Sequence, residues 1–294
     1  MPVKQNTTVM ANMASVNPRE IDFVTRFERN WRALMDIMGI SRPIRKVNGT
    51  KLVSRVASVT LQSGAVAEGD EIPYSQATVT EVPYADITIE KYAKAVSIES
   101  ISKYGYDIAI EKTDDEFLNE LQSVVMAKFY TYLGTGTLTD TASTFQSALA
   151  KAKGKVLNAF QNMHRTATEV VAFVNVEDMY DYLGTAPITV QTQSGITYLE
   201  NFMGYRTVFL CGSDQIASGT VIAVPRENID LYYIDPSDSD FARAGLQFTT
   251  DGETNLIGFH TEGKYSHAVS EAYAIMGMVL FAEYLNGIAV ITVQ

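Results

Sequence analysis

Residues 52–98 read LVSRVASVTLQSGAVAEGDEIPYSQATVTEVPYADITIEKYAKAVSI, and this stretch decides what kind of fold the chain can adopt. Its Val, Ile, Thr and Tyr residues flank a single Gly-rich acidic tip, residues 63–73, so it predicts a long two-stranded ribbon. An isolated two-stranded ribbon is at best marginally stable in water. The sequence therefore predicts a segment that depends on a neighbouring molecule for support.

The apolar positions in the second limb of this ribbon change phase. Val79 is odd-numbered, Val82 and Tyr84 are even, and Ile87 is odd again. A change of phase moves side chains to the other face of a strand, so we expect bulges or sharp twists here. Pro83 lacks the N–H that a central strand donates, so we expect an edge strand or a free ribbon.

Composition limits the function classes that fit this chain of 294 residues. It carries 23 Lys and Arg against 34 Asp and Glu, a net charge of −11, which suits tight non-specific nucleic-acid binding poorly. Cys211 is the only cysteine, so no intrachain disulfide is possible and we expect a buried apolar side chain. We find no secretory signal and no run of about 20 apolar residues, and expect a soluble protein made in a cytoplasm.

Two strong helices are predicted. Residues 17–20 (NPRE) have the composition of a helix start, residues 21–38 follow with apolar side chains at helical spacing, and Gly39 ends the pattern. The second helix begins at a capping box, residues 113–116, and ends at Gly134. Its length of about 20 residues corresponds to a rod of roughly 30 Å.

The remainder of the chain is predicted to be an α/β lobe followed by a β-rich end. We expect helices at 143–160 and 176–183, and strands at 169–175, 205–210, 220–224 and 229–234. The last fifty residues are strand-like, with turn signals at Asp251-Gly252 and Asn286-Gly287.

Local motifs of catalysis or metal binding are missing from the sequence. His260 and His267 each have a glutamate within four residues, but in a strand-like region that lacks the helical spacing of zinc ligands. No G-x-S-x-G is present, and Gly134-Thr-Gly136 ends a helix instead of opening one. The acidic residues 235–240 lack the pattern of a calcium loop and are predicted to form a solvated turn. We expect no catalytic residue, no cofactor and no metal, and so no enzyme, although many carboxylates remain.

Three stretches give the chain a family resemblance. Residues 63–98 resemble an extended loop and the strand after it, residues 201–233 (NFMGYRTVFLCGSDQIASGTVIAVPRENIDLYY) an axial lobe, and residues 281–293 (FAEYLNGIAVITV) a closing hairpin. In this order they resemble the major capsid proteins of tailed bacteriophages, the Hong Kong phage or Johnson fold.

This resemblance implies an α+β fold with an N-terminal arm, an extended β-hairpin loop, a peripheral domain with a long spine helix, and an axial α/β domain. We expect residues 1–39 to be the arm and first helix, and 40–98 the extended loop and its base. Residues 99–142 plus 246–294 are expected to be the peripheral domain, and 143–245 the axial domain.

The resemblance also implies a structural function. The expected protein is a major head protein that self-assembles into an icosahedral shell of hexamers and pentamers and encloses double-stranded DNA without sequence-specific binding. It would reside in the virion capsid after assembly in the bacterial cytoplasm, away from membranes. A portal protein is an implied partner, and a decoration protein is left open.

Two departures from other family members change the expected assembly route. The first helix begins close to Met1, which leaves no room for a long N-terminal scaffolding segment, so we expect a separate scaffolding protein. Residues 56–90 contain no lysine, so the covalent loop-tip crosslink of some family members is not expected.

Charge suggests how neighbouring subunits meet. Residues 56–90 hold six acidic side chains and no basic one, whereas residues 19–55 hold nine basic and four acidic side chains, a net of +5. Opposite charges on adjacent segments are typical of subunit complementarity, although both segments as solvated surfaces remain the alternative. The predicted interface places Glu68, Asp70, Glu71, Glu81, Asp86 and Glu90 of one subunit against Arg26, Arg29, Arg32, Arg42, Arg45 and Lys46 of the next.

Two other functions stay open at this point. An encapsulin-type nanocompartment shares the fold and would hold a cargo enzyme in place of DNA. A two-lobe hydrolase that uses unmarked carboxylates is the alternative from a different class.

Overall fold

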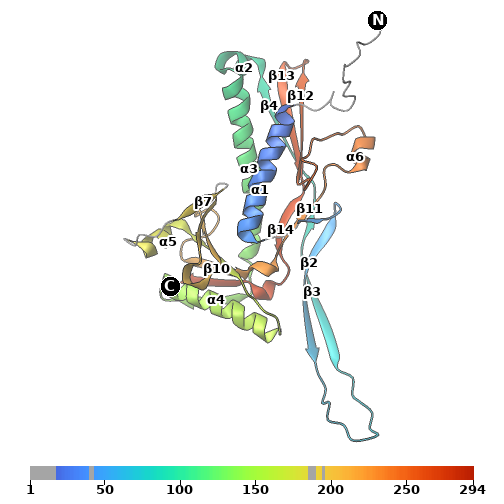
Figure 1. Ribbon diagram of the computed structural model, residues 1–294, viewed down its shortest axis with the longest axis vertical. Helices are drawn as coiled ribbons and strands as arrows, with labels where there is room; N and C mark the ends of the chain where they lie inside the picture. The colour runs from blue at the N-terminus through green and yellow to red at the C-terminus, as the bar shows by residue number, and fades with distance from the viewer. Residues whose placement is uncertain (1–17, 40–42, 185–189, 194–195) are drawn as a thin grey trace, which may run out of the picture. The chain divides into compact units, whose positions relative to one another are not determined.

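The computed structural model describes residues 18–39, 43–184, 190–193 and 196–294 (Figure 1). The chain forms two compact units. The first holds the described residues up to Arg32 together with Ile89–Gln122 and Ile234–Gly277, and the second holds Ala33–Thr88, Ser123–Tyr233 and Met278–Gln294. This partition differs from the four segments expected from sequence, which stay a prediction, and the expected arm lies outside the described residues.

The first unit is built on a three-stranded antiparallel sheet. The sheet has the order β12 (Ile257–Lys264), β13 (Val269–Met276), β4 (Glu90–Ser97), and helix α1 (Pro18–Met38) contributes its first part to the unit. Phe23 of α1 stacks on Phe259 of β12, with ring centroids 3.9 Å apart and planes 9° apart. Because strand side chains alternate between faces, His260 and Tyr273, which are paired in the register, belong to the opposite face.

The helical part of the first unit starts earlier than the sequence predicts. Helix α2 (Ile98–Tyr104) is followed by a π-helical turn (Asp107–Glu111) that runs directly into α3 (Lys112–Leu133). The predicted capping box at 113–116 is wrong, because the hydroxyl of Thr113 donates to the carbonyls of Ala109 and Ile110 inside the continuous helix. The short α6 (Ser239–Arg243) completes the unit.

The second unit contains the predicted α/β lobe as a seven-stranded sheet. Its order is β5 (Leu138–Ala142), β15 (Ala289–Val293), β10 (Thr220–Pro225), β6 (Val170–Asn175), β9 (Thr207–Cys211), β8 (Ile196–Glu200) and β7 (Gln191–Gln193). Helix α4 (Phe145–Asn162) packs on β10 and β15, and α5 (Val176–Leu183) packs on β6. The predictions of both helices and of three of these strands are confirmed within two residues.

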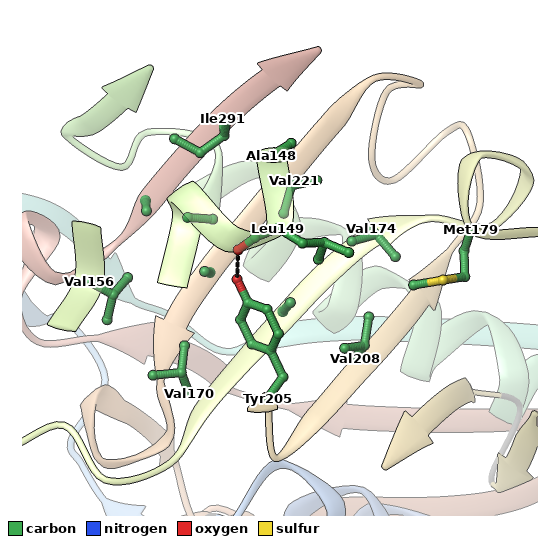
Figure 2. Close-up of a cluster of buried hydrophobic side chains, with 14 of the residues drawn as sticks. Ala148, Leu149, Val156, Val170, Val174, Met179, Tyr205, Val208, Val221 and Ile291 are labelled. Atoms are coloured by element: carbon green, nitrogen blue, oxygen red, sulfur yellow. Dashed lines mark hydrogen bonds between the residues drawn. The ribbon is translucent and has the colours of Figure 1, made fainter. Parts of the chain in front are cut away.

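Buried aliphatic side chains hold α4 against this sheet. Leu149 and Val156 of α4 belong to one buried cluster with Val174, Val208 and Val221 of three neighbouring strands, and all five are labelled in Figure 2. Every residue of β6 is buried, as expected for a central strand covered on both faces. The Tyr205 hydroxyl donates to the Leu149 carbonyl over 2.6 Å, which satisfies the only polar group that this ring brings into the core (Figure 2).

The predicted closing hairpin is wrong. Strand β14 (Met278–Ala282) pairs with β11 (Ile229–Tyr233) in a three-stranded sheet with β1 (Ile44–Arg45), whereas β15 joins the seven-stranded sheet. A 3-10 turn, Leu285–Gly287, carries the chain from one sheet to the other. The Asp251-Gly252 signal is likewise part of a wider loop closed by the Thr249–Phe259 bridge.

The predicted ribbon is present as a separate two-stranded sheet of β2 (Thr50–Thr60) and β3 (Gln76–Ile87) (Figure 1). Its register is regular from Thr60–Gln76 to Val53–Pro83, and the one irregularity lies between Lys51 and Val53. There Leu52 of β2 lies opposite two residues of β3, Tyr84 and Ala85, so the irregularity predicted from the phase change between Tyr84 and Ile87 is confirmed, whereas none is found for the change between Val79 and Val82. The last part of the stretch, β4, leaves the ribbon and pairs with β13.

Candidate functional site

The outer part of the ribbon makes no packed contact in its own unit, since every residue from 59 to 81 is exposed. The loop that joins the strands is held by sparse hydrogen bonds, among them Gln62 N–H to Ser75 Oγ at 3.1 Å. It nevertheless carries large apolar side chains: Leu61 is 78% exposed, Ile72 69% and Tyr74 90%. Single exposed apolar residues are ordinary, but three large ones on a single exposed loop are typical of an interaction surface.

Five of the six predicted interface carboxylates are exposed, and they lie on the ribbon or its loop. Glu68, Asp70 and Glu71 occupy the joining loop, and Glu81 and Asp86 lie on β3. Glu90 differs, because it lies on β4 in the first unit, is half-buried, and accepts a hydrogen bond from the Tyr92 hydroxyl at 2.5 Å.

Arg26 of α1 has acidic partners in its own chain. Its guanidinium lies 3.1 Å from Asp22, one turn earlier, and donates to the Asp115 carboxylate of α3. The side chain is about one-third exposed, so these contacts already satisfy much of its charge. The predicted role of Arg26 at an intersubunit contact therefore has to compete with this pairing.

Arg32 of α1 also pairs with acidic side chains of its own chain. Its Nη2 lies 2.8 Å from Asp251 and 2.6 Å from Glu253, both in the loop before β12. The Asp251 carboxylate also accepts the backbone N–H groups of Glu253, Thr254 and Asn255, each at 3.0 Å. Arg32 thus binds an acidic turn of its own unit, in which backbone N–H groups already hold the Asp251 carboxylate.

A third α1 arginine, Arg19, binds Asp114 with two nitrogens, at 2.6 and 2.8 Å. Lys94 of β4 adds a contact of 2.5 Å to the same carboxylate. Burial alone would raise the pKa of Asp114, but the hydrogen bonds from Arg19 and Lys94 lower it. Three of the four arginines of α1 are consequently used inside the subunit.

The remaining basic residues differ in availability. Arg29 is exposed on α1 and forms no ion pair with any described residue, which leaves it the most accessible of the predicted set. Arg45 is exposed on β1, while Lys46 lies 4.8 Å from the centre of the Tyr232 ring. Arg42 lies outside the described residues.

The intrachain partners of these arginines could not be found from sequence. Asp115 was assigned to a capping box, and Asp251 and Glu253 lie more than 200 residues from Arg32 along the chain. The apolar residues of the ribbon loop, in contrast, were readable as a signal: Leu61, Ile72 and Tyr74 interrupt an otherwise small and polar segment.

Two buried glutamates of α1 have a structural role. Glu20 accepts the backbone N–H of Thr261 at 2.6 Å, and Glu28 accepts that of Leu256 at 2.8 Å and a hydroxyl hydrogen bond from Thr254. Burial raises the pKa of Glu28 to about 7, against the lowering effect of the Thr254 hydrogen bond. These carboxylates tie the helix to the β12 strand and the loop before it.

The described residues contain no group of three or more His, Cys, Asp and Glu side chains placed to hold a metal ion. Cys211 is buried, and burial raises the pKa of its thiol to about 12. Asp235 accepts the N–H of Ser237 at 2.8 Å, so the acidic segment 235–240 begins with a side-chain-capped turn. None of the helices in the described ranges is long and apolar enough to cross a membrane.

Solved structures show where this fold occurs. The cyanophage A-1(L) capsid subunit is 13% identical, with a TM-score of 0.53 over 88% of this chain and 91% of that chain. The mature capsid of bacteriophage PhiM1 is 8% identical, with a TM-score of 0.53 over 86% of this chain and 85% of that one. A structure from Mycobacterium phage Che8 is 11% identical, with a TM-score of 0.50 over 99% and 94%.

By sequence, the chain matches no protein-family model and no curated protein. The likeness in three dimensions establishes the fold, which is the α+β fold of tailed-bacteriophage major capsid proteins. The resemblance stated from the sequence is confirmed at this level.

Proposed function

We propose that this chain is the structural subunit of a capsid shell, which assembles as hexamers and pentamers into an icosahedral particle around double-stranded DNA. The observation that carries the proposal is the exposed β2–β3 ribbon within a fold shared with phage capsids over most of the chain. Separate scaffolding and portal proteins are part of the proposal. The role is structural, without a catalytic step.

The energetics of the ribbon support assembly. A two-stranded ribbon has no third strand and no covering helix, so it gains little from burial in its own subunit. Three large apolar side chains on its loop would each gain about 1.5–3 kcal/mol if they were buried on a neighbour. Such burial, repeated over every subunit of a shell, stabilises both the ribbon and the particle.

The charge contact forms the second part of the proposal, and it involves fewer basic residues than the sequence analysis predicts. The exposed carboxylates of the ribbon loop meet basic side chains of the neighbouring subunit, with Arg29 as the accessible candidate on α1. Arg26 and Arg32 hold their own subunit together, so reversing their charge would disturb folding and assembly at once. Because exposed ion pairs contribute about 0–1 kcal/mol each, the contact acts collectively.

Imaging the purified protein tests the shell directly. At high concentration, negative-stain or cryo-electron microscopy should show closed particles tens of nanometres across. A clean monomer or dimer at the same concentration would contradict the shell function and favour the two-lobe hydrolase.

Charge variants test the contact separately from the fold. The variant Glu68→Gln, Asp70→Asn, Glu71→Gln should keep the thermal unfolding curve of the wild-type subunit and should assemble less at physiological salt. A matched variant, Glu120→Gln, Asp181→Asn, Asp214→Asn, removes three equally exposed carboxylates elsewhere and should assemble normally. Equal assembly of both variants would remove the charge contact from the proposal.

The contents of the particle separate the phage capsid from the nanocompartment. Particles purified from the native source should release nuclease-sensitive double-stranded DNA when they are opened. Release of one folded enzyme without DNA would assign the chain to the encapsulin-type shells.

A further inference from the structure

A groove of about 650 Å³ lies in the first unit, on the face of the three-stranded sheet opposite Phe23. One wall is formed by Phe241 of α6 and by Leu246 and Phe248 of the segment that follows this helix. The floor is formed by the sheet and includes His260 and Tyr273, neighbours in the β12–β13 register. Its volume is within the usual range of binding pockets, and Leu246 is 56% exposed at its rim.

The start of helix α1 is fixed next to this groove. Glu20, which is 2% exposed, accepts hydrogen bonds from the N–H and the hydroxyl of Thr261, at 2.6 and 2.8 Å. It also accepts the hydroxyl of Thr249 at 2.6 Å, and its Oε1 lies 3.6 Å from Nδ1 of His260. The chain that precedes Pro18 therefore enters α1 within a few residues of the groove.

We propose that residues 1–17 of the same chain dock in this groove through the side chains of Met10 and Met13. The segment has the required chemistry, since it carries Val9, Met10, Met13 and Val16 and only one charged side chain, Lys4. Methionine is flexible and polarizable, so it fills irregular apolar space and packs well against aromatic rings.

Covalent attachment of residues 1–17 to the unit lowers the affinity that docking in the groove requires. An extended chain spans about 3.3 Å per residue, so Met13 reaches roughly 16 Å and Met10 roughly 26 Å from Pro18. Because the segment is joined to the unit by a short link, its local concentration at the groove is in the millimolar range. Half-occupancy at a millimolar concentration requires about 4 kcal/mol, and the burial of two methionine side chains contributes about 3–6 kcal/mol.

Side-chain insertion fits the edge of the sheet better than strand addition does. β12 is the edge strand, but Phe259 already pairs with Thr249 through N–H and C=O, at 3.0 and 2.9 Å. The N–H of Thr261 is taken by Glu20. The backbone groups that an added strand would use at this point are thus occupied, whereas the groove beside them is open.

Disulfide trapping in the full-length chain, below its assembly concentration, tests the docking. Cys211 is 1% exposed and does not compete, so the pair Met13→Cys and Leu246→Cys reports one contact. Under mild oxidation this pair should form an intrachain disulfide about tenfold faster than the control pair Met13→Cys and Tyr265→Cys, because docking raises the local concentration. Tyr265 is a suitable control, since it is 99% exposed in the same unit and does not line the groove.

Equal rates for the two pairs would overturn the proposal. Disulfide-linked dimers through Leu246→Cys that increase with protein concentration would also overturn it, by showing that a second copy supplies the segment. These results do not depend on whether the chain forms a shell, because they are measured on the unassembled subunit.

A second measurement uses a single engineered thiol. In the Met13→Cys chain, docking should protect the thiol from a maleimide reagent, and adding Leu246→Asp should increase its reaction rate about tenfold by placing a charge in the apolar groove. Leu246 is largely exposed, so this change leaves the fold intact. The matched change Tyr265→Asp should leave the rate unaltered; an equal increase with both would contradict the docking.

Discussion

Helix α1 supplies three arginines of the predicted charge contact and the β2–β3 ribbon with its loop supplies five carboxylates, but the two sets of side chains have different surroundings. The helix buries Phe23, Phe27 and Trp31 and pairs Arg26 and Arg32 with acids of its own chain. The ribbon leaves both its carboxylates and its apolar loop residues exposed. Net charge in sequence therefore does not distinguish a surface that is already paired from one that is available to a neighbour.

The largest difference between the two regions should be in subunit stability. Phe23→Ala removes a fully buried ring that stacks on Phe259, so we expect a loss of about 3–5 kcal/mol in the free energy of unfolding. Urea denaturation of the unassembled subunit measures it.

The ribbon supplies the control for this change. Tyr74→Ala removes a ring that is 90% exposed, so we expect a change within about 0.5 kcal/mol. A loss with Tyr74→Ala as large as that with Phe23→Ala would show that the ribbon loop packs within its own subunit, and the comparison would fail.

The next largest effect concerns the buried carboxylate of α1. The pKa of Glu28 is raised from 4.5 to about 7, so the folded state binds this proton more tightly than the unfolded chain does. Its contribution to stability is complete below about pH 4.5 and is lost as the pH rises towards 7, about 3 kcal/mol in total. Glu28→Gln, which keeps the shape and cannot ionise, should remove this part of the pH dependence.

Thermal unfolding between pH 4.5 and 8 measures the effect. The variant Glu68→Gln in the exposed ribbon loop is the control and should follow the wild-type curve. If Glu28→Gln also followed the wild-type curve, the Glu28 carboxylate would not be the source of the slope.

A smaller effect is expected from the arginines. Arg32→Ala breaks the contacts with Asp251 and Glu253, but Asp251 keeps three backbone donors, so we expect a loss of about 1 kcal/mol. Arg29→Ala, on the exposed face of the same helix, should change subunit stability by less than about 0.5 kcal/mol. Urea denaturation distinguishes the two variants. Equal losses of stability would contradict a stabilising role of Arg32 within its own subunit.

Much of the fold was predictable because local patterns carry it. Helix α1, helices α4 and α5 and strands β6, β9 and β10 follow from periodicity and from end signals such as Gly39 and Gly184. The capping box at 113–116 failed, because Thr113 bonds to the turn before it only once the π-helical segment has formed. The closing hairpin failed because Leu285–Gly287 changes sheets, and strand partners are set by the whole fold.

The candidate site was predictable in part for the same reason. Exposure of the ribbon follows from its composition and from Pro83, which suits a sheet without further strands. The pairing of Arg32 with Asp251 depends on a contact between residues 219 positions apart, which no local pattern encodes. Charge counting therefore found carboxylates that are exposed on the ribbon, but it included basic residues that the subunit already uses, and the contact between the two sets stays a prediction.

Deletion of the ribbon loop tests the difference between α1 and the ribbon with a change that should have almost no effect on subunit stability. Thr60 and Gln76 are opposite each other at the last pair of the ribbon, so residues 61–75 can be replaced by Asn-Gly, which closes a two-residue hairpin turn. The removed loop buries nothing in its own unit, and its loss shortens the connection, so we expect the unfolding midpoint of the subunit to stay within a few degrees. Sedimentation and electron microscopy should nevertheless show no closed particles, because the proposed shell contact uses the apolar and acidic side chains of this loop. Normal particles from this variant would mean that the ribbon loop is dispensable, and the interface would then have to be sought on the packed faces of the two units.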